Sequence, residues 1–205
     1  MKRIAIVIVT IGILILGGVV ISMYENNHKS QSNRSSATVT KSHTNHKGKT
    51  LVVYLSRTGH TQEVAQLIHR EVGGDLLRLT TAKSYPKKYQ DMLATAQSEQ
   101  DANARPKLRG TLPNLDDYQT IFLGYPIWWN KNPMAINTFL NHYHSLEGKT
   151  IYPFTTSGSS GLGSSVSELK KNAPEAEFGK GLPITDDQMT RAPELVKNWV
   201  KEIGF

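Results

Sequence analysis

The sequence predicts an α/β domain in which a parallel β-sheet carries helices on both faces. Two observations predict this fold class. From residue 50 onward, short apolar segments alternate with segments of helical period, and polar loops containing glycine follow the apolar segments. The 205 residues, 38% of them hydrophobic, suit one such domain with an appendage better than two full domains. We expect three parts: an anchor at 1–23, a linker at 24–49 and the domain at 50–205.

Five apolar or β-branched segments are expected to form the strands. They lie at 51–56, 75–79, 120–125, 150–155 and 177–183. The segment 51–56 is nearly continuously apolar and ends in a turn, as a parallel strand buried on both faces requires. The segment 177–183 has the weakest strand pattern. Pro153 is unusual for a central strand, because proline has no N–H to donate.

The residues between these segments show the periodicity of amphipathic helices. The expected helices lie at 61–72, 85–100, 133–143, 164–171 and 193–203. In the first, Val64, Leu67 and Ile68 share one face, and Gly73 with Gly74 marks its end. Pro133 stands near the start of the third helix, where proline is tolerated. This alternation predicts βαβ units and a parallel sheet between two layers of helices.

The charge distribution argues against nucleic-acid binding. The chain has a net charge of +7, but residues 1–50 hold seven basic side chains and one acidic side chain. Residues 51–205 hold 17 basic and 16 acidic side chains and are nearly neutral. We therefore expect no nucleic-acid partner. The chain contains no cysteine, which excludes disulfides, thiolate metal sites and cysteine nucleophiles.

The N-terminal segment has the length and composition of a membrane anchor. Residues 4–22 carry no charge and follow Lys2 and Arg3; about twenty apolar residues span a bilayer as a helix. No clear small-residue cleavage site follows Ser22, so an uncleaved signal anchor is favoured over a cleaved signal peptide, which would give a secreted protein. The positive-inside rule places residue 24 onward outside the cytoplasm. The polar segment 24–49 is expected to be a flexible tether.

The loop after the first strand has the composition of a phosphate site. It leaves a strand and opens a helix, so it presents backbone N–H groups and the positive end of a helix dipole to an anion. Three hydroxyls surround a glycine that permits close approach of the backbone. The residues are Ser56, Arg57, Thr58, Gly59, His60 and Thr61. An ordinary helix cap would need one such hydroxyl, so a phosphate monoester is the better interpretation.

Here the chain resembles a known family. The pattern S-x-T-G-x-T at 56–61 resembles the flavin mononucleotide (FMN) phosphate loop of flavodoxins, and the likeness extends over 50–205. The segment 124–129 (Gly-Tyr-Pro-Ile-Trp-Trp) resembles the second flavin loop of one flavodoxin-like subfamily, and 155–161 resembles the third. The resemblance implies a doubly wound three-layer fold with a five-stranded parallel sheet in the order 2-1-3-4-5. It also implies FMN as cofactor.

The resemblance extends the candidate FMN site over the two later loops. The second loop contributes Pro126, Ile127, Trp128, Trp129 and Asn130, and the third contributes Thr156, Ser157, Gly158 and Gly161. One of the two tryptophans is expected to cover the flavin ring, because large aromatic rings stack well on flat π-systems; the other is expected in the core. The subfamily has glycine where this chain has Asn130, and asparagine tolerates positive φ better than most residues.

The expected function is extracytoplasmic electron transfer by bound FMN, with no catalytic residue and no metal required of the protein. The neutral domain lacks the acidity usual in flavodoxins, so a different redox partner is expected. An FMN-dependent NAD(P)H:quinone-type oxidoreductase is one alternative, although no separate nicotinamide fingerprint is present. A non-redox binding module with the same fold is another, and the intact loop at 56–61 argues against it.

Overall fold

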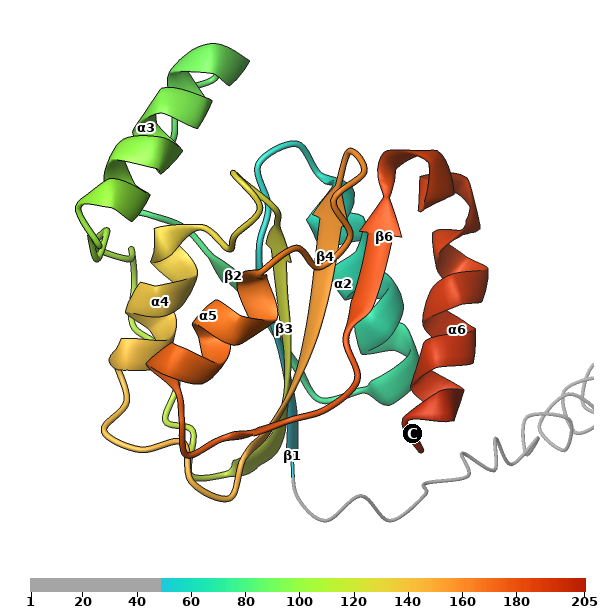
Figure 1. The fold of residues 1–205 in the computed structure, drawn as a ribbon. Coiled ribbons are helices and arrows are strands. Elements are labelled where there is room, and N and C mark those ends of the chain that lie inside the picture. Colours follow the sequence, from blue (N-terminus) through green and yellow to red (C-terminus); the bar gives the residue numbers. More distant parts are fainter. Residues whose placement is uncertain (1–48) are drawn as a thin grey trace, which may run out of the picture. The chain divides into compact units, whose positions relative to one another are not determined.

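A parallel sheet runs through the centre of the computed structural model, which describes residues 49–205 (Figure 1). The predicted anchor and the linker up to residue 48 lie outside the described residues. The strands are β1 (Lys49–Leu55), β2 (Asp75–Leu79), β3 (Tyr118–Pro126), β4 (Thr150–Ser157), β5 (Glu177–Phe178) and β6 (Leu182–Thr185). Their order is β2-β1-β3-β4-β5, with β6 also paired to β4, and all of these pairings are parallel. The predicted fold class and strand order are confirmed.

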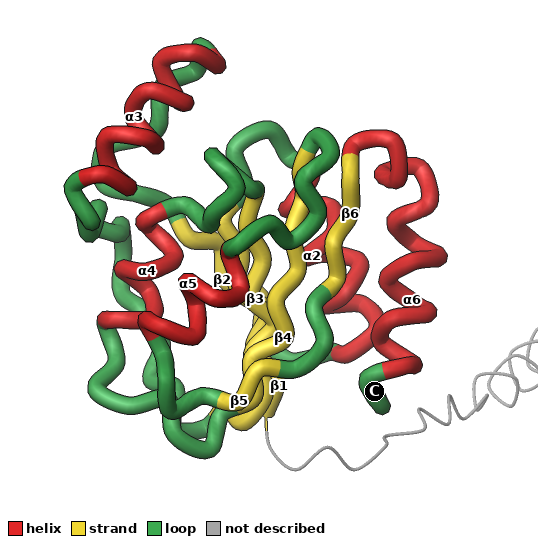
Figure 2. The backbone as a smooth tube through the Cα atoms, in the orientation of Figure 1, coloured by secondary structure: helices red, strands yellow, loops and turns green. Residues whose placement is uncertain are grey.

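Helices cover both faces of the sheet (Figures 1 and 2). They are α2 (His60–Val72), α3 (Tyr89–Asp101), α4 (Met134–Asn141), α5 (Ser165–Asn172), the 3₁₀ helix η1 (Asp186–Arg191) and α6 (Ala192–Glu202). Helices α2 and α6 lie on one face, and α4 and α5 lie on the other. None of the helices in 49–205 has the length and apolar character needed to cross a membrane.

Helix α3 stands out from the sheet and buries only Met92 and Ala96 (Figure 1). The predicted helix 85–100 begins four residues later than expected, at Tyr89. Pro86 explains why Tyr85 is not helical, because a proline disfavours helical backbone in the residue before it. Residues 80–88 connect the end of β2 to α3.

The alternation of side chains along β1 explains its continuous apolar sequence. Leu51, Val53 and Leu55 belong to the core cluster that contains Ile136 of α4. Val52 and Tyr54 belong to the opposite cluster, with residues of α2 and α6. Successive side chains of a strand point to opposite faces of the sheet, so a strand covered on both faces needs apolar residues at every position.

Pro153 is tolerated because the fifth sheet position is filled by two short strands instead of one. Strand β5 pairs with β4 only at Thr150 and Ile151, and β6 pairs with β4 from Phe154 onward. Pro153 lies between these two pairings, where β4 behaves as an edge strand on that side. The weak pattern at 177–183 thus has a structural cause, since its middle residues pair with no strand.

Candidate functional site

Three loops meet at the carboxyl ends of the strands and enclose a cleft of about 520 Å³. The loops follow β1, β3 and β4, as the sequence predicted, and lie at one edge of the sheet (Figure 2). The lining residues are Arg57, Thr58, His60, Tyr89, Met92, Pro126, Ile127, Trp128, Thr156, Ser157, Gly158 and Asp186. Ligands of open α/β sheets bind at this edge, and the volume falls in the usual range of small-molecule sites, about 300–1,000 Å³.

The first loop leaves the N-terminus of α2 open toward the cleft. Gly59 has φ +113° and stands before the helix, and no side chain caps the helix. The Gly59 N–H donates to Ser56 Oγ at 3.2 Å, so the serine closes the loop on itself. The first N–H groups of a helix have no partner inside the helix, and here they are available to an anion. Thr58 is exposed and adds a hydroxyl to the cleft.

Thr61 connects the first loop to the third. Its side chain is 2% exposed, and its Oγ1 lies 2.7 Å from Thr156 Oγ1. Thr61 is the second residue of α2, whereas Thr156 is near the end of β4. This buried hydroxyl pair fixes the helix N-terminus against the strand end. Thr61 therefore supports the wall of the cleft, and Thr156 lines it.

The second loop is a tight turn with two residues at positive φ. Trp128 and Lys131 exchange two backbone hydrogen bonds of 2.9 and 3.0 Å, and the residues between them, Trp129 and Asn130, have φ of +50° and +63°. This pattern is a type I′ turn, in which asparagine is favoured. Asn130 thus adopts a positive φ, which asparagine tolerates better than most residues. The positive φ of Trp129 was not expected, because bulky residues rarely adopt it.

The two adjacent tryptophans have different environments. Trp128 is 5% exposed, lines the cleft and packs edge-to-face on Tyr85 with ring centroids 4.8 Å apart. Trp129 is 50% exposed, and its Nε1–H donates to the Leu93 carbonyl of α3 at 2.9 Å. Trp128 belongs to the core cluster, which confirms the expectation of one core tryptophan, and it also lines the cleft. Trp129 ties the turn to α3.

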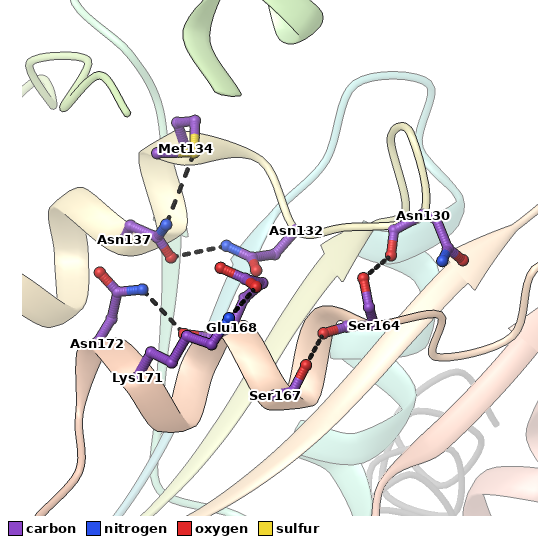
Figure 3. A network of polar contacts seen from close by, with 9 residues as sticks. All are labelled: Asn130, Asn132, Met134, Asn137, Ser164, Ser167, Glu168, Lys171 and Asn172. Carbon is purple, nitrogen blue, oxygen red and sulfur yellow. Dashed lines mark hydrogen bonds and ion pairs between the residues drawn. The ribbon is translucent and has the colours of Figure 1, made fainter. Parts of the chain in front are cut away.

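The third loop is braced from within and against the second loop. Ser157 Oγ accepts a hydrogen bond from the Gly161 N–H at 3.0 Å, and Thr155 Oγ1 donates to the Gly161 carbonyl at 2.9 Å. Ser164 then reaches the carbonyl of Asn130 in the second loop (Figure 3). These bonds hold Ser157 and Gly158 in the cleft wall, as expected for a positioned loop.

The structure separates the predicted site residues into two groups. Eight line the cleft, namely Thr58, His60, Pro126, Ile127, Trp128, Thr156, Ser157 and Gly158. Six lie behind it and shape the loops, namely Ser56, Gly59, Thr61, Trp129, Asn130 and Gly161. The supporting residues carry the same sequence signals as the lining residues, because both occur in the same short loops.

Three lining residues lie outside the three loops. Tyr89 and Met92 come from α3, and Asp186 begins η1 just after β6. Asp186 Oδ1 lies 3.3 Å from Nδ1 of His60, so an acid and an imidazole are in contact in the cleft lining. Nothing in the local sequence marks Asp186, because its position depends on the break between β5 and β6. Arg57 adds a cation to the same lining.

Behind Trp128, a tyrosine and a glutamate form a partly buried pair. The Tyr85 hydroxyl donates to Glu99 Oε2 at 2.8 Å. Burial, with the nearby Glu99 charge, raises the pKa of Tyr85, and burial also raises the pKa of Glu99 although the tyrosine bond opposes it. Tyr85 is thus a neutral donor that holds α3 beside the cleft. Within 49–205, no cluster of three or more histidine or acidic side chains could hold a metal ion.

The fold and the cleft define a doubly wound α/β protein with a ligand site at the carboxyl edge of its sheet. Residues 49–203 match the family model described as flavodoxin, and the chain belongs to the flavodoxin family.

Two solved structures of Bacteroides proteins, each described as a candidate flavoprotein, are similar over nearly their whole length. The protein from Bacteroides eggerthii is 33% identical, with 77% of this chain and 99% of that chain covered and a TM-score of 0.67. The protein from Bacteroides uniformis is 38% identical, with 75% and 98% covered and a TM-score of 0.67. A flavoprotein from Lactobacillus acidophilus, solved in complex with FMN, is 20% identical, with 72% and 99% covered and a TM-score of 0.58. No curated protein matches the sequence.

Proposed function

We propose that the cleft binds FMN and that the protein transfers electrons through this flavin. One observation carries the proposal: the open N-terminus of α2 and the Trp128 ring line the same cleft of about 520 Å³. A nucleotide with a dianionic phosphate and a flat aromatic ring needs both kinds of surface. Membership of the flavodoxin family and the FMN complex of the Lactobacillus acidophilus protein support this choice of ligand.

The residues of the cleft fit the chemistry of FMN. The N–H groups at the start of α2, with the Thr58 hydroxyl, would hold the phosphate. Trp128 lines the cleft and is held by its edge-to-face contact with Tyr85, so the part of the indole that faces the cleft would contact the ring. Ser157 and Gly158 would face the polar edge of the ring from the third loop. Asp186 is the one acid in the lining, and His60 beside it offsets its charge when protonated.

Bound FMN would supply the redox chemistry, and the protein residues would bind, orient and shield it. The bonds of Thr61 to Thr156 and of Ser164 to Asn130 join the three loops, so the cleft walls are preorganised. A rigid site favours electron transfer because little rearrangement of the protein accompanies the change of charge. No side chain in this proposal acts as an acid, a base or a nucleophile.

We also propose that the domain works outside the cytoplasm on a membrane tether. The uncharged stretch 4–22 after Lys2 and Arg3 supports an anchor, and the polar composition of 24–48 supports a tether. A tether raises the local concentration of the domain near a membrane-bound electron donor and lets it reach a second partner. Detection of the full-length chain in the membrane fraction, with the domain accessible to protease added outside the cells, tests this placement.

An absorption and fluorescence titration of the purified full-length chain tests FMN binding. We expect bound FMN to show shifted absorption bands and quenched fluorescence. Free-FMN bands and undiminished fluorescence at saturating protein would contradict the proposal. Steady-state oxidation of NADH and NADPH then distinguishes the two redox functions, because turnover with a quinone indicates the reductase and its absence favours the electron carrier.

A further inference from the structure

A second pocket lies next to the cofactor cleft and is lined by three arginines. Arg57, Arg78 and Arg109 surround a volume of about 210 Å³, which we call the arginine pocket. The remaining lining residues are Leu55, Ser56, Thr80, Thr81, Ser84 and Tyr85. No carboxylate lines the pocket, and none in the described part of the chain forms an ion pair with any of the three arginines.

The fold brings these arginines together from three separate segments. Arg57 follows β1, and Arg78 lies in β2, which pairs with β1. Arg109 arrives on a segment that runs antiparallel to the residues after β2, through the bridge between Thr81 and Leu108 and the bond from the Arg109 N–H to the Thr80 carbonyl at 2.8 Å. Three cations are therefore gathered by backbone pairing, and no anion among residues 49–205 forms an ion pair with them.

Each guanidinium is oriented by one bond to a backbone carbonyl. Arg78 Nη2 donates to the Ser56 carbonyl at 3.3 Å, Arg109 Nη2 donates to the Ala82 carbonyl at 3.2 Å, and Arg57 Nη2 donates to the Lys87 carbonyl. A guanidinium has five N–H donors, so one such bond fixes the group and leaves most of its donors. The buried Nε of Arg57 has no hydrogen-bond partner. An unpaired buried donor is costly, and a ligand oxygen would satisfy it.

The charge of the lining adds to this arrangement. Three basic side chains and no acidic side chain line the pocket, although residues 51–205 as a whole are almost neutral. Positive charge concentrated around a concave site raises the local concentration of anions. Arginine forks match the geometry of phosphate oxygens and bind them through paired hydrogen bonds.

We propose that the arginine pocket is an oxyanion site that binds the phosphate group of a small molecule beside the cofactor cleft. Its volume of about 210 Å³ is below the range of about 300–1,000 Å³ for whole-ligand sites, so it fits one group of a ligand. Arg57 lines both the pocket and the cleft. A molecule held by its phosphate in the pocket would therefore lie against the cofactor site. The inference does not depend on FMN binding.

Calorimetric titration of the full-length chain with inorganic phosphate tests the proposal. All variants are compared in a Thr58→Glu background, so that the first loop contributes no phosphate binding. The variants are Arg78→Gln with Arg109→Gln, and Arg191→Gln as a control, since Arg191 is exposed and pairs with Glu194. We expect the background protein and Arg191→Gln to bind phosphate alike, and the double variant to bind at least about tenfold more weakly. FMN affinity, measured separately, reports on the proposed function alone.

Three results would overturn the site: no saturable phosphate binding in the Thr58→Glu background, binding unchanged in the double variant, or equal loss in Arg191→Gln. A lower thermal unfolding midpoint of the double variant with unchanged phosphate affinity would also overturn the proposal, because it would show that the arginines stabilise the fold and do not bind phosphate. We also expect acetate to bind more weakly than phosphate. Tighter binding of acetate would contradict a site for phosphate groups. Adenosine monophosphate distinguishes the source: affinity above that of inorganic phosphate indicates a nucleotide, and equal affinity indicates free phosphate.

Discussion

The backbone carbonyl of Asn130 accepts two hydrogen bonds from Ser164, one from its N–H at 2.8 Å and one from its Oγ at 2.9 Å. Figure 3 shows the hydroxyl bond, which joins the second loop to the residue before α5. Asn132, two residues further along, is buried and donates to Asn137 of α4 at 2.8 Å. The type I′ turn is thus held on its C-terminal side by residues outside it.

Replacing Ser164 by alanine should loosen this turn. The variant keeps the backbone bond and loses the hydroxyl bond, so we expect FMN affinity to fall by about 1 kcal/mol, or roughly fivefold. Fluorescence titration measures the loss. Ser167→Ala is the matched control, because Ser167 bonds the Ser164 carbonyl within its own helix and does not reach the turn. Equal losses in the two variants would contradict the bracing role.

Gly124→Ala should destabilise the domain. A Cβ at Gly124 would lie 2.0 Å from the ring of Phe154, its partner across β3 and β4. Since Phe154 is fully buried and cannot move away freely, we expect a loss of about 1–3 kcal/mol in the free energy of unfolding. Urea denaturation measures it. Gly158→Ala is the control, because a Cβ there meets only Asp186 Oδ2, at 4.0 Å; a loss as large as that of Gly124→Ala would refute the steric explanation.

The sequence predicts the fold well because the buried strands and amphipathic helices carry local signals. Strand 51–56 is apolar throughout, and the helix after it has one apolar face. The break between β5 and β6 could not be foreseen, since it depends on pairing with β4. For the same reason, the place of Asp186 in the cleft lining was missed.

The total charge of the domain also concealed a local feature. Near-neutrality over 51–205 could not show that Arg57, Arg78 and Arg109 converge. Arg57 and Arg109 are 52 positions apart and meet only through the pairing of Thr81 with Leu108. Motif residues of the loops, in contrast, are contiguous and were found from the sequence.

The two tryptophans should respond differently to substitution. We expect Trp128→Leu to change the visible absorption bands of bound FMN, because Trp128 lines the cleft, and Trp129→Leu to leave them unchanged. Visible absorption and circular dichroism spectra of the two FMN-saturated variants measure this difference. A spectral change of equal size in Trp129→Leu would show that the exposed ring covers the flavin instead.

Replacing Glu99 by glutamine should stabilise the domain in a pH-dependent way. Burial raises its pKa in the folded state, so the fold favours the protonated form, and ionised Glu99 costs stability above that pKa. Glu99→Gln keeps an acceptor for the Tyr85 hydroxyl and removes the charge. We expect the variant to be more stable than wild type near pH 8, with the difference vanishing below about pH 4, where glutamate is protonated in both states. Denaturation at the two pH values measures this; a gain that persists at low pH would point to another cause.

The most direct test of the central claim is the FMN dissociation constant of Thr58→Glu compared with Thr111→Glu. Thr58 lines the cleft beside the open N-terminus of α2, whereas Thr111 is exposed and outside the cleft lining. Because a carboxylate would repel the phosphate, we predict that Thr58→Glu weakens FMN binding by about tenfold or more and that Thr111→Glu leaves it unchanged. Equal FMN affinity in both variants would contradict a phosphate site at the end of β1.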